Sequence, residues 1–330
     1  TLRTYLEPVA AIEQDKLGSL VARKEGSSAR PRVILAAHMD EIGLMVRYIT
    51  KEGFLKFVQL GGWWDQTLLG QRMIVKTHKG DLVGIIGAKP PHLLKKEDRD
   101  KIVRLSDMYI DIGVSSKEEV EEAGVRLGDP VVPDSAFHTM ANGQAYLNKA
   151  WDDRAGCALM VQVLQQLARE PHPNTVYAAA TVQEEVGLRG AQTSAALVDP
   201  DVAIILDVDI AGDIPGLEDE EKAVAMGKGP SVLLYDAAMI PNLKLRDLVI
   251  ETAKQEEIPL QMSAITGGAT DGGRIHMHDQ GVPTITIGLP SRHIHSHNSV
   301  IHRGDYDNAL KLLMAVIRKL DADTVASLAL

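Results

Sequence analysis

Short apolar runs alternate along most of this chain with segments whose apolar residues recur at helical spacing. The short runs are rich in β-branched residues and predict buried strands at residues 32–38, 174–182, 202–210, 259–265 and 283–289. Helical patterns lie between them at residues 153–167, 243–255 and 305–320. Because alternating strands and helices build parallel sheets that helices cover on both faces, we predict an α/β fold with a mostly parallel sheet.

The stretch from residue 68 to residue 137 has a different pattern. It is rich in Gly, Lys and Asp, with short apolar runs at 71–77 and 81–86 and one helical pattern at 116–123. Turn residues separate these runs, which is typical of a compact β-rich domain. We therefore predict a main domain of residues 1–67 and 138–330, interrupted by an inserted β-rich domain of residues 68–137.

Composition narrows the class of protein. The apolar fraction is 45% and the charged fraction is 24%, as in ordinary globular proteins. The formal net charge of −10 disfavours nucleic acid and anionic membranes as partners. No apolar run approaches the roughly 20 residues that a membrane span needs. The only cysteine, Cys157, lies in an apolar stretch, so we expect a buried free thiol and a reducing, cytoplasmic location.

Acidic and histidine side chains recur where the predicted strands end. They are His38 and Asp40, Glu184 and Glu185, Asp207 and Asp209, His293, His295 and His297, and the pair Asp152 and Asp153 before a helix. Taken singly, most have ordinary explanations, such as a helix cap for the Asp pair or a solvated surface for the Glu pair. Asp207 does not, because an acid in a strand buried on both faces is costly unless it is paired or metal-bound.

Together these segments bring imidazole and carboxylate groups to one edge of one sheet, where ligands bind in open α/β folds. Two divalent cations need about three protein ligands each, with one carboxylate shared, and a further carboxylate can serve as general base. The adjacent residues Glu184 and Glu185 suit these two roles, because neighbouring side chains diverge. The pattern therefore predicts a two-metal hydrolytic site.

A series of motifs occurs in order along essentially the whole chain: AAHMDEIGLMV, LLGQR, IGAKPPHLL, MYIDIGVSSKEEVEEAGVRLGDPV, AWDDRAG, TVQEEVGLRGA, ILDVDIAGD, TGGATDGG and RHIHS. Together they resemble the TET-type dinuclear metal-dependent aminopeptidases, the family of glutamyl, leucyl and deblocking aminopeptidases. The resemblance implies removal of N-terminal residues from peptides through a two-metal-activated water, with Glu184 as general base. It implies two divalent metal ions per subunit, with zinc or cobalt expected and manganese as the third option. The family usually has sequence ahead of residue 1, so we expect a trimmed start.

The same resemblance implies a ligand set. His38, Asp152 and Asp207 would hold one metal, and Asp152, Glu185 and His295 would hold the other, with Asp152 bridging. Asp40 would accept a hydrogen bond from His38 and orient its ring. The peptide bond between Asp152 and Asp153 would be cis.

The choice among His293, His295 and His297 rests on the resemblance. Residues two apart on an extended strand point the same way, so their spacing does not distinguish them. The family's aromatic-x-His-Ser pattern selects His295. His293 and His297 stand where the family usually has Tyr and often has Pro, and Asp209 stands where Thr is common. An additional ligand among these residues therefore stays open.

The family's inserted domain forms dimers that combine into tetrahedral dodecamers, so we expect the insert to mediate a homo-oligomer that admits peptides.

Two alternative functions on the same scaffold are a glucan hydrolase and a deacylase. A glycosidase needs only two opposed carboxylates, which leaves the rest of the cluster unexplained. A non-enzymatic binding role would need loss of a ligand or the base, and none is missing. The preferred N-terminal residue stays open, because the pattern places no basic residue in the pocket.

Overall fold

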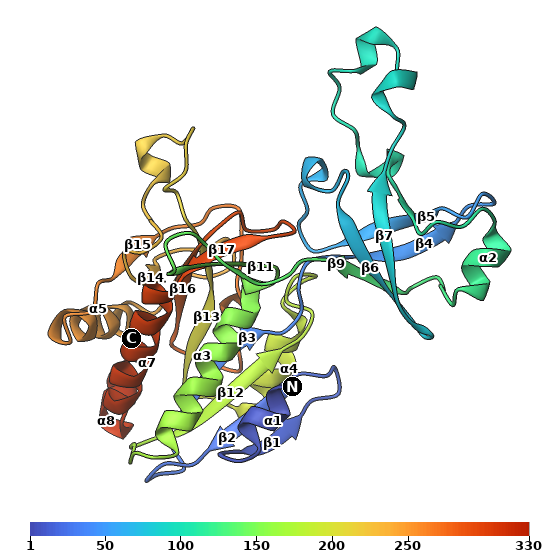
Figure 1. Cartoon of the computed structure of the whole chain (residues 1–330). Coiled ribbons are helices and arrows are strands. Elements are labelled where there is room, and N and C mark those ends of the chain that lie inside the picture. The colour runs from blue at the N-terminus through green and yellow to red at the C-terminus, as the bar shows by residue number, and fades with distance from the viewer. Residues whose placement is uncertain (330) are drawn as a thin grey trace.

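Four parallel strands form the centre of an 11-stranded sheet in the computed structural model, which describes residues 1–329 (Figure 1). In spatial order they are β12 (Thr175–Thr181), β3 (Arg32–His38), β13 (Val202–Ile210) and β16 (Thr284–Arg292). Antiparallel strands extend both edges: β1 (Ala11–Gln14), β2 (Leu20–Lys24), β17 (Ser299–His302), β11 (Ala145–Asn148) and β10 (His138–Thr139). Two short strands, β14 (Ser231–Leu233) and β15 (Gln261–Ser263), pair beside β16.

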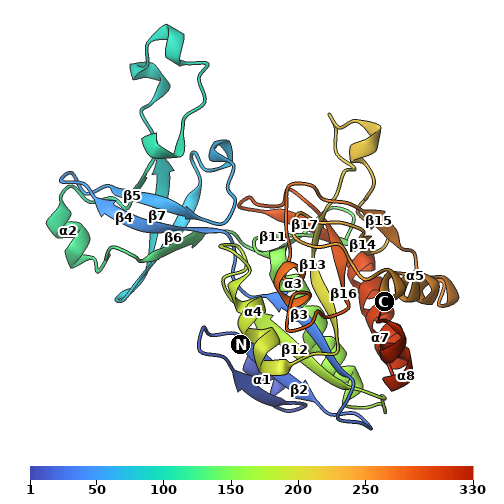
Figure 2. The ribbon, with the colours of Figure 1, turned by 180° about the vertical axis from the view of Figure 1, so that it is seen from behind.

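Helices cover both faces of this sheet, as the continuous apolar strands require. One face carries α3 (Trp151–Leu167) and α7 (Arg303–Lys319), against which α1 (Leu2–Leu6) and α5 (Leu243–Gln255) pack. The other face carries α4 (Arg189–Val198) and α6 (Gly272–Ile275), and α8 (Ala322–Ser327) follows α7 (Figure 2). Alternate residues of β3 enter different cores, with Leu35 on the α3 side and Ile34 on the α4 side. The predicted α/β fold is therefore confirmed.

Most of the predicted elements form close to their expected bounds. The exception is β15, which covers only three residues of the predicted run at 259–265. The chain leaves the sheet there because residues 264–270 form a loop that lines a pocket. Cys157 is buried as expected, and burial raises the pKa of its thiol. No helix in the described part of the chain is long and apolar enough to span a membrane.

A closed β-barrel projects from the α/β body (Figure 1). Its strands, in order around the barrel, are β4 (Gly43–Ile49), β5 (Leu55–Leu60), β8 (Tyr109–Asp111), β7 (Gly80–Gly87), β6 (Arg72–Thr77) and β9 (Pro130–Pro133). Helix α2 (Lys117–Glu122) lies between β8 and β9. The barrel has a core of its own, which includes Leu44, Leu55, Met73 and Ile110.

The predicted start of the insert at residue 68 differs from this boundary. The barrel begins at Gly43, only a few residues after β3 ends at His38. The composition changes near residue 68, but β4 and β5 already close the barrel by pairing with β9 and β8. Those contacts are distant in sequence, so local composition does not reveal them.

Candidate metal centre

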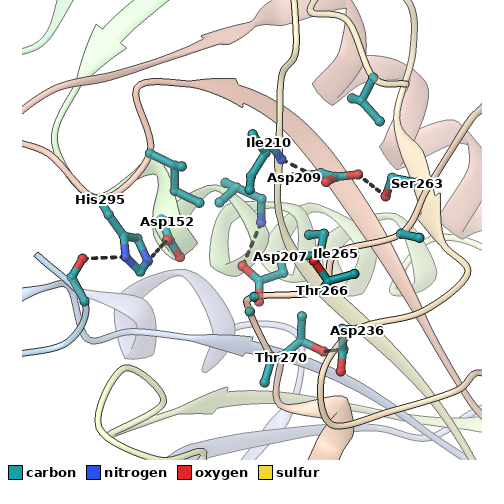
Figure 3. A pocket seen from close by; sticks show the side chains of 18 of the residues that line it. Asp152, Asp207, Asp209, Ile210, Asp236, Ser263, Ile265, Thr266, Thr270 and His295 are labelled. Carbon is teal, nitrogen blue, oxygen red and sulfur yellow. Dashed lines mark hydrogen bonds and ion pairs between the residues drawn. The ribbon is translucent and has the colours of Figure 1, made fainter. Parts of the chain in front are cut away.

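All the predicted site residues gather at the carboxyl ends of the four parallel strands. His38 ends β3, and Asp40 follows it; Glu184 and Glu185 follow β12; Asp207 lies in β13; His295 follows β16; Asp152 lies at the start of α3. Figure 3 shows Asp152, Asp207 and His295 around one cavity. Separate segments of the chain therefore meet at one edge of the sheet.

Asp152 lies between the two histidines. Its Oδ1 is 2.8 Å from Nε2 of His38, and its Oδ2 is 3.3 Å from Nε2 of His295. One oxygen therefore faces each imidazole. Hydrogen bonds from the two histidines hold the pKa of Asp152 below its usual range despite its burial. The peptide bond between Asp152 and Asp153 is cis, as the resemblance implied.

Both histidines direct the same ring nitrogen at the cluster. Nδ1–H of His38 donates to the backbone carbonyl of Asp40 at 3.0 Å, and Nδ1–H of His295 donates to the carbonyl of Gly62 at 2.7 Å. Because a carbonyl only accepts, these contacts fix the proton on Nδ1 and leave Nε2 facing the carboxylates. This is the arrangement that an Nε2 metal ligand needs.

Asp40 hydrogen-bonds His38 through its backbone carbonyl rather than its carboxylate. Its nearest carboxylate oxygen is 3.7 Å from Nδ1 of His38, too far for a hydrogen bond, and its backbone carbonyl takes that proton instead. The carboxylate accepts from the amide N–H groups of Glu184 and Glu185 at 3.1 and 3.2 Å. Asp40 therefore fixes the turn that carries both glutamates as well as the His38 ring.

The segment after β16 is not the extended strand that the sequence analysis assumed. His293 and His295 have φ values of 62° and 55°, so the chain turns at both residues and successive histidines diverge. His293 is exposed, whereas His297 is buried with Nε2 at 3.0 Å from Sδ of Met73 and its ring 5.5 Å from that of Trp63. Burial lowers the pKa of His297 to about 4. Only His295 of the three reaches the cluster.

Burial strongly affects the charge of the two glutamates. It raises the pKa of Glu184 to about 10 and that of Glu185 to about 7, with neighbouring carboxylates adding to the effect. Burial also raises the pKa of Asp207 well above its usual range, and Asp152 adds to it. Carboxylates crowded in this way repel one another unless cations lie among them.

Asp153 and Asp271 are two further buried acids beside the cluster, and neither belongs to the ligand set that the resemblance implied. Asp153 accepts from the amides of His38 and Gly156 at 3.3 and 3.0 Å, which ties α3 to β3. Asp271 accepts from Thr181 Oγ1, while its Oδ1 has no hydrogen-bond partner. The motifs AWDDRAG and TGGATDGG include both acids, but their burial depends on packing between distant segments.

A cavity of about 870 Å³ opens beside the cluster and extends beyond Asp207. Its wall includes Asp209, which is 1% exposed and accepts hydrogen bonds from Ser231, Ser263 and the Ile210 amide. Arg274, an exposed residue of α6, also lines the cavity. No local sequence pattern indicates that Arg274 lies in the pocket, because α6 approaches the pocket only through tertiary packing.

The barrel also contributes to the site, through the loop after β5. A Cβ atom added at Gly61 would lie 2.9 Å from Oε2 of Glu185, and one added at Gly62 would lie 3.1 Å from Nδ1 of His295. Gly61 also has a φ of 84°, which favours glycine. The Gly-Gly pair in the sequence was the available signal for this close approach.

Comparison with known proteins agrees with this geometry. A family model described as M42 glutamyl aminopeptidase matches residues 18–312. The putative aminopeptidase FrvX of Escherichia coli is 41% identical over 97% of this chain and 89% of its own length. The lysyl aminopeptidase of Pyrococcus furiosus is 36% identical over 94% of this chain and 87% of its own. The glutamyl aminopeptidase of Lactococcus lactis is 34% identical over 96% of this chain and 88% of its own length.

Solved structures are similar along nearly the whole chain. A TET aminopeptidase from a marine sediment Thaumarchaeota archaeon has a TM-score of 0.97 at 51% identity, covering 99% of this chain and 92% of its own. The TET1 peptidase of Pyrococcus horikoshii, solved as a dodecamer, has a TM-score of 0.86 at 32% identity, covering 97% and 92%. A Thermotoga maritima protein described as an endoglucanase has a TM-score of 0.79 at 30% identity, covering 99% and 93%.

Proposed function

Because the chain belongs to the M42 glutamyl aminopeptidase family, we propose that it removes N-terminal residues from peptides with two divalent cations bound beside Asp152. Membership of the family makes it a peptide hydrolase of the aminopeptidase type that uses divalent metal. The number of ions and the role of each residue belong to the proposal. The observation that carries it is the contact of each Asp152 oxygen with a different imidazole Nε2.

The residues fit divalent cations. His38, Asp152 and Glu185 each offer a ligand atom within one small cluster, and His38, Asp153 and Asp207 form a second. Oε1 of Glu185 is buried without any hydrogen-bond partner, which is costly for a carboxylate that has nothing to bind. Imidazole and carboxylate together suit zinc, cobalt and manganese, with zinc or cobalt our first expectation.

We assign the ligands as the resemblance implied. His38 and Asp207 would hold one ion, Glu185 and His295 would hold the other, and Asp152 would be shared between them. Asp153 also lies near His38 and Asp207, but both of its oxygens accept backbone amides, so we assign it to positioning. Oε2 of Glu184 lies 3.9 Å from Nε2 of His38, so Glu184 would stand beside bound ions but outside the assigned set.

Glu184 is the proposed general base. Bound divalent cations would supply Lewis acidity toward the peptide carbonyl and favour the ionised form of nearby acids. Ionised Glu184 accepts a proton from the attacking water and returns it to the departing amine. Asp40 holds Glu184 in place through the backbone amide.

The first test is hydrolysis of a panel of aminoacyl-p-nitroanilides by the purified protein before and after chelation. We expect release of p-nitroaniline that a chelator abolishes and that zinc or cobalt restores, because the assigned ligands need a cation to act. Soluble glucan and acylated amino acids belong in the same panel, since one structural relative is described as an endoglucanase. Hydrolysis of glucan without any aminoacyl substrate would overturn the aminopeptidase proposal.

We also propose a homo-oligomer assembled through the β-barrel, because the TET1 relative is solved as a dodecamer and the barrel projects from the body. Dimers joined at the barrel would build a tetrahedral dodecamer that admits peptides. We expect light scattering after size exclusion to give about twelve times the subunit mass of 35.8 kDa. A monomer at all concentrations would contradict the assembly.

We also propose a cytoplasmic location, which the single buried thiol fits.

A further inference from the structure

Asp209 is a buried acid that the proposed reaction does not use. It lies two residues after Asp207 on β13, so both side chains point to the same face of the sheet. Two serine hydroxyls and the amide of Ile210 donate to it, with Ser263 Oγ at 2.6 Å. Among residues 1–329, no cationic side chain forms an ion pair with Asp209. A buried carboxylate without a cation carries a desolvation cost that the hydroxyls offset only in part.

Asp209 lies where the side chain of the first residue of a bound peptide would extend. Figure 3 shows Asp209 on the side of Asp207 away from Asp152 and His295, along the same cavity wall. Asp209 is two positions after Asp207 on the strand, which corresponds to about 7 Å along it. An extended lysine or arginine side chain spans that distance from a peptide whose first carbonyl lies at the metal centre.

The rest of the cavity wall suits a long cationic side chain. Ile210 and Ile265 line it and offer apolar surface to the methylene groups. Asp236, which is 2% exposed, adds a second buried acid to the wall. Glu220 and Glu221, from the loop that contains the short helix η5 (Asp219–Glu221), add negative charge at the surface.

Arg274 is the one lysine or arginine among the cavity-lining residues that the structure describes, and it would favour an acidic substrate side chain. It is exposed, whereas Asp209 is almost completely buried. A charge pair is stronger in the low-dielectric interior than in contact with water, so the buried acid has the larger effect on a side chain that enters the cavity. A glutamate side chain in the same place would meet Asp209 and Asp236 with a like charge.

We propose that Asp209 makes this cavity select peptides whose first residue is lysine or arginine. The inference rests on the proposed aminopeptidase function, because it assigns the cavity to the side chain of the residue that is removed. Asp209 is a specificity residue here, since it contacts the substrate side chain and none of the reacting atoms.

The test compares kcat/KM for Lys-, Arg-, Leu- and Glu-p-nitroanilide in the metal-loaded wild type and Asp209→Asn. We expect the wild type to prefer Lys and Arg, with Glu the poorest substrate. In Asp209→Asn the ratio of kcat/KM for Lys to that for Leu should fall by about 10- to 100-fold, the effect of losing one buried charge-assisted contact. The loss should appear mainly in KM, since the contact forms before reaction. Asn preserves the shape, and Asp209→Thr provides a second variant if Asn fails to fold.

Asp219→Asn is the matched control, because Asp219 lies in η5, is fully exposed and does not line the cavity. Its Lys to Leu ratio should equal that of the wild type. A wild type that prefers Leu or Glu, or an unchanged ratio in Asp209→Asn, would overturn the specificity while leaving the aminopeptidase intact. The absence of hydrolysis for every substrate in the metal-loaded wild type would instead overturn the proposed function, and the inference with it.

Discussion

Replacement of Glu184 by glutamine should lower kcat by about 10²- to 10⁴-fold, the usual contribution of a general base. Glutamine has nearly the same shape and keeps the backbone N–H contact with Asp40, but it accepts no proton at neutral pH. Because Glu184 lies outside the assigned ligand set, the variant should retain its bound metal. Stopped-time assays with the preferred aminoacyl-p-nitroanilide measure kcat, and metal analysis of the same sample measures the bound metal.

Glu185→Gln is the matched control for this experiment. Glu185 lies in the same turn, and its amide also donates to the Asp40 carboxylate, but Glu185 is assigned to the metal near His295. Its replacement should lower metal content as well as activity, and excess zinc or cobalt should restore part of the activity. If Glu184→Gln loses metal and Glu185→Gln keeps it, the two roles are exchanged. Full activity in Glu184→Gln would exclude it as the base.

Replacement of Asp152 by asparagine should remove both metals and the activity with them. Each oxygen of Asp152 faces one histidine Nε2, so the loss of its charge weakens both sites at once. Cations that bind only the folded state stabilise it by about 4 kcal/mol when present at 1,000 times Kd. The wild type should therefore melt at a clearly higher temperature with zinc or cobalt than with a chelator, whereas Asp152→Asn should show little difference.

Thermal unfolding with and without chelator measures this difference, and inductively coupled plasma analysis gives the metal content. Asp219→Asn, a change at a fully exposed acid, should keep the wild-type difference in melting temperature. If Asp152→Asn still binds two ions and responds to the chelator as the wild type does, the bridging role is wrong. Loss of one ion only would assign Asp152 to a single site.

The sequence determined most of the α/β body because its signals are local. A continuous apolar run such as residues 202–210 has to be buried on both faces, and β13 covers that same run. Polar residues at the ends of such strands meet at one edge because parallel strands end on the same side. The motif residues His38, Glu184 and Asp207 could therefore be placed together, and their roles were inferred from the resemblance.

Tertiary structure decided the features that depend on contacts between distant segments. The barrel starts at Gly43 because β4 pairs with β9, nearly ninety positions later in the chain, and no local pattern records that pairing. The turns at His293 and His295 direct one histidine to the metal centre and another into the core, which spacing on a strand does not predict. The hydroxyl groups around Asp209 come from β14 and β15. Sequence periodicity reports which positions are buried, whereas only the packed chain brings particular donors and acids within contact.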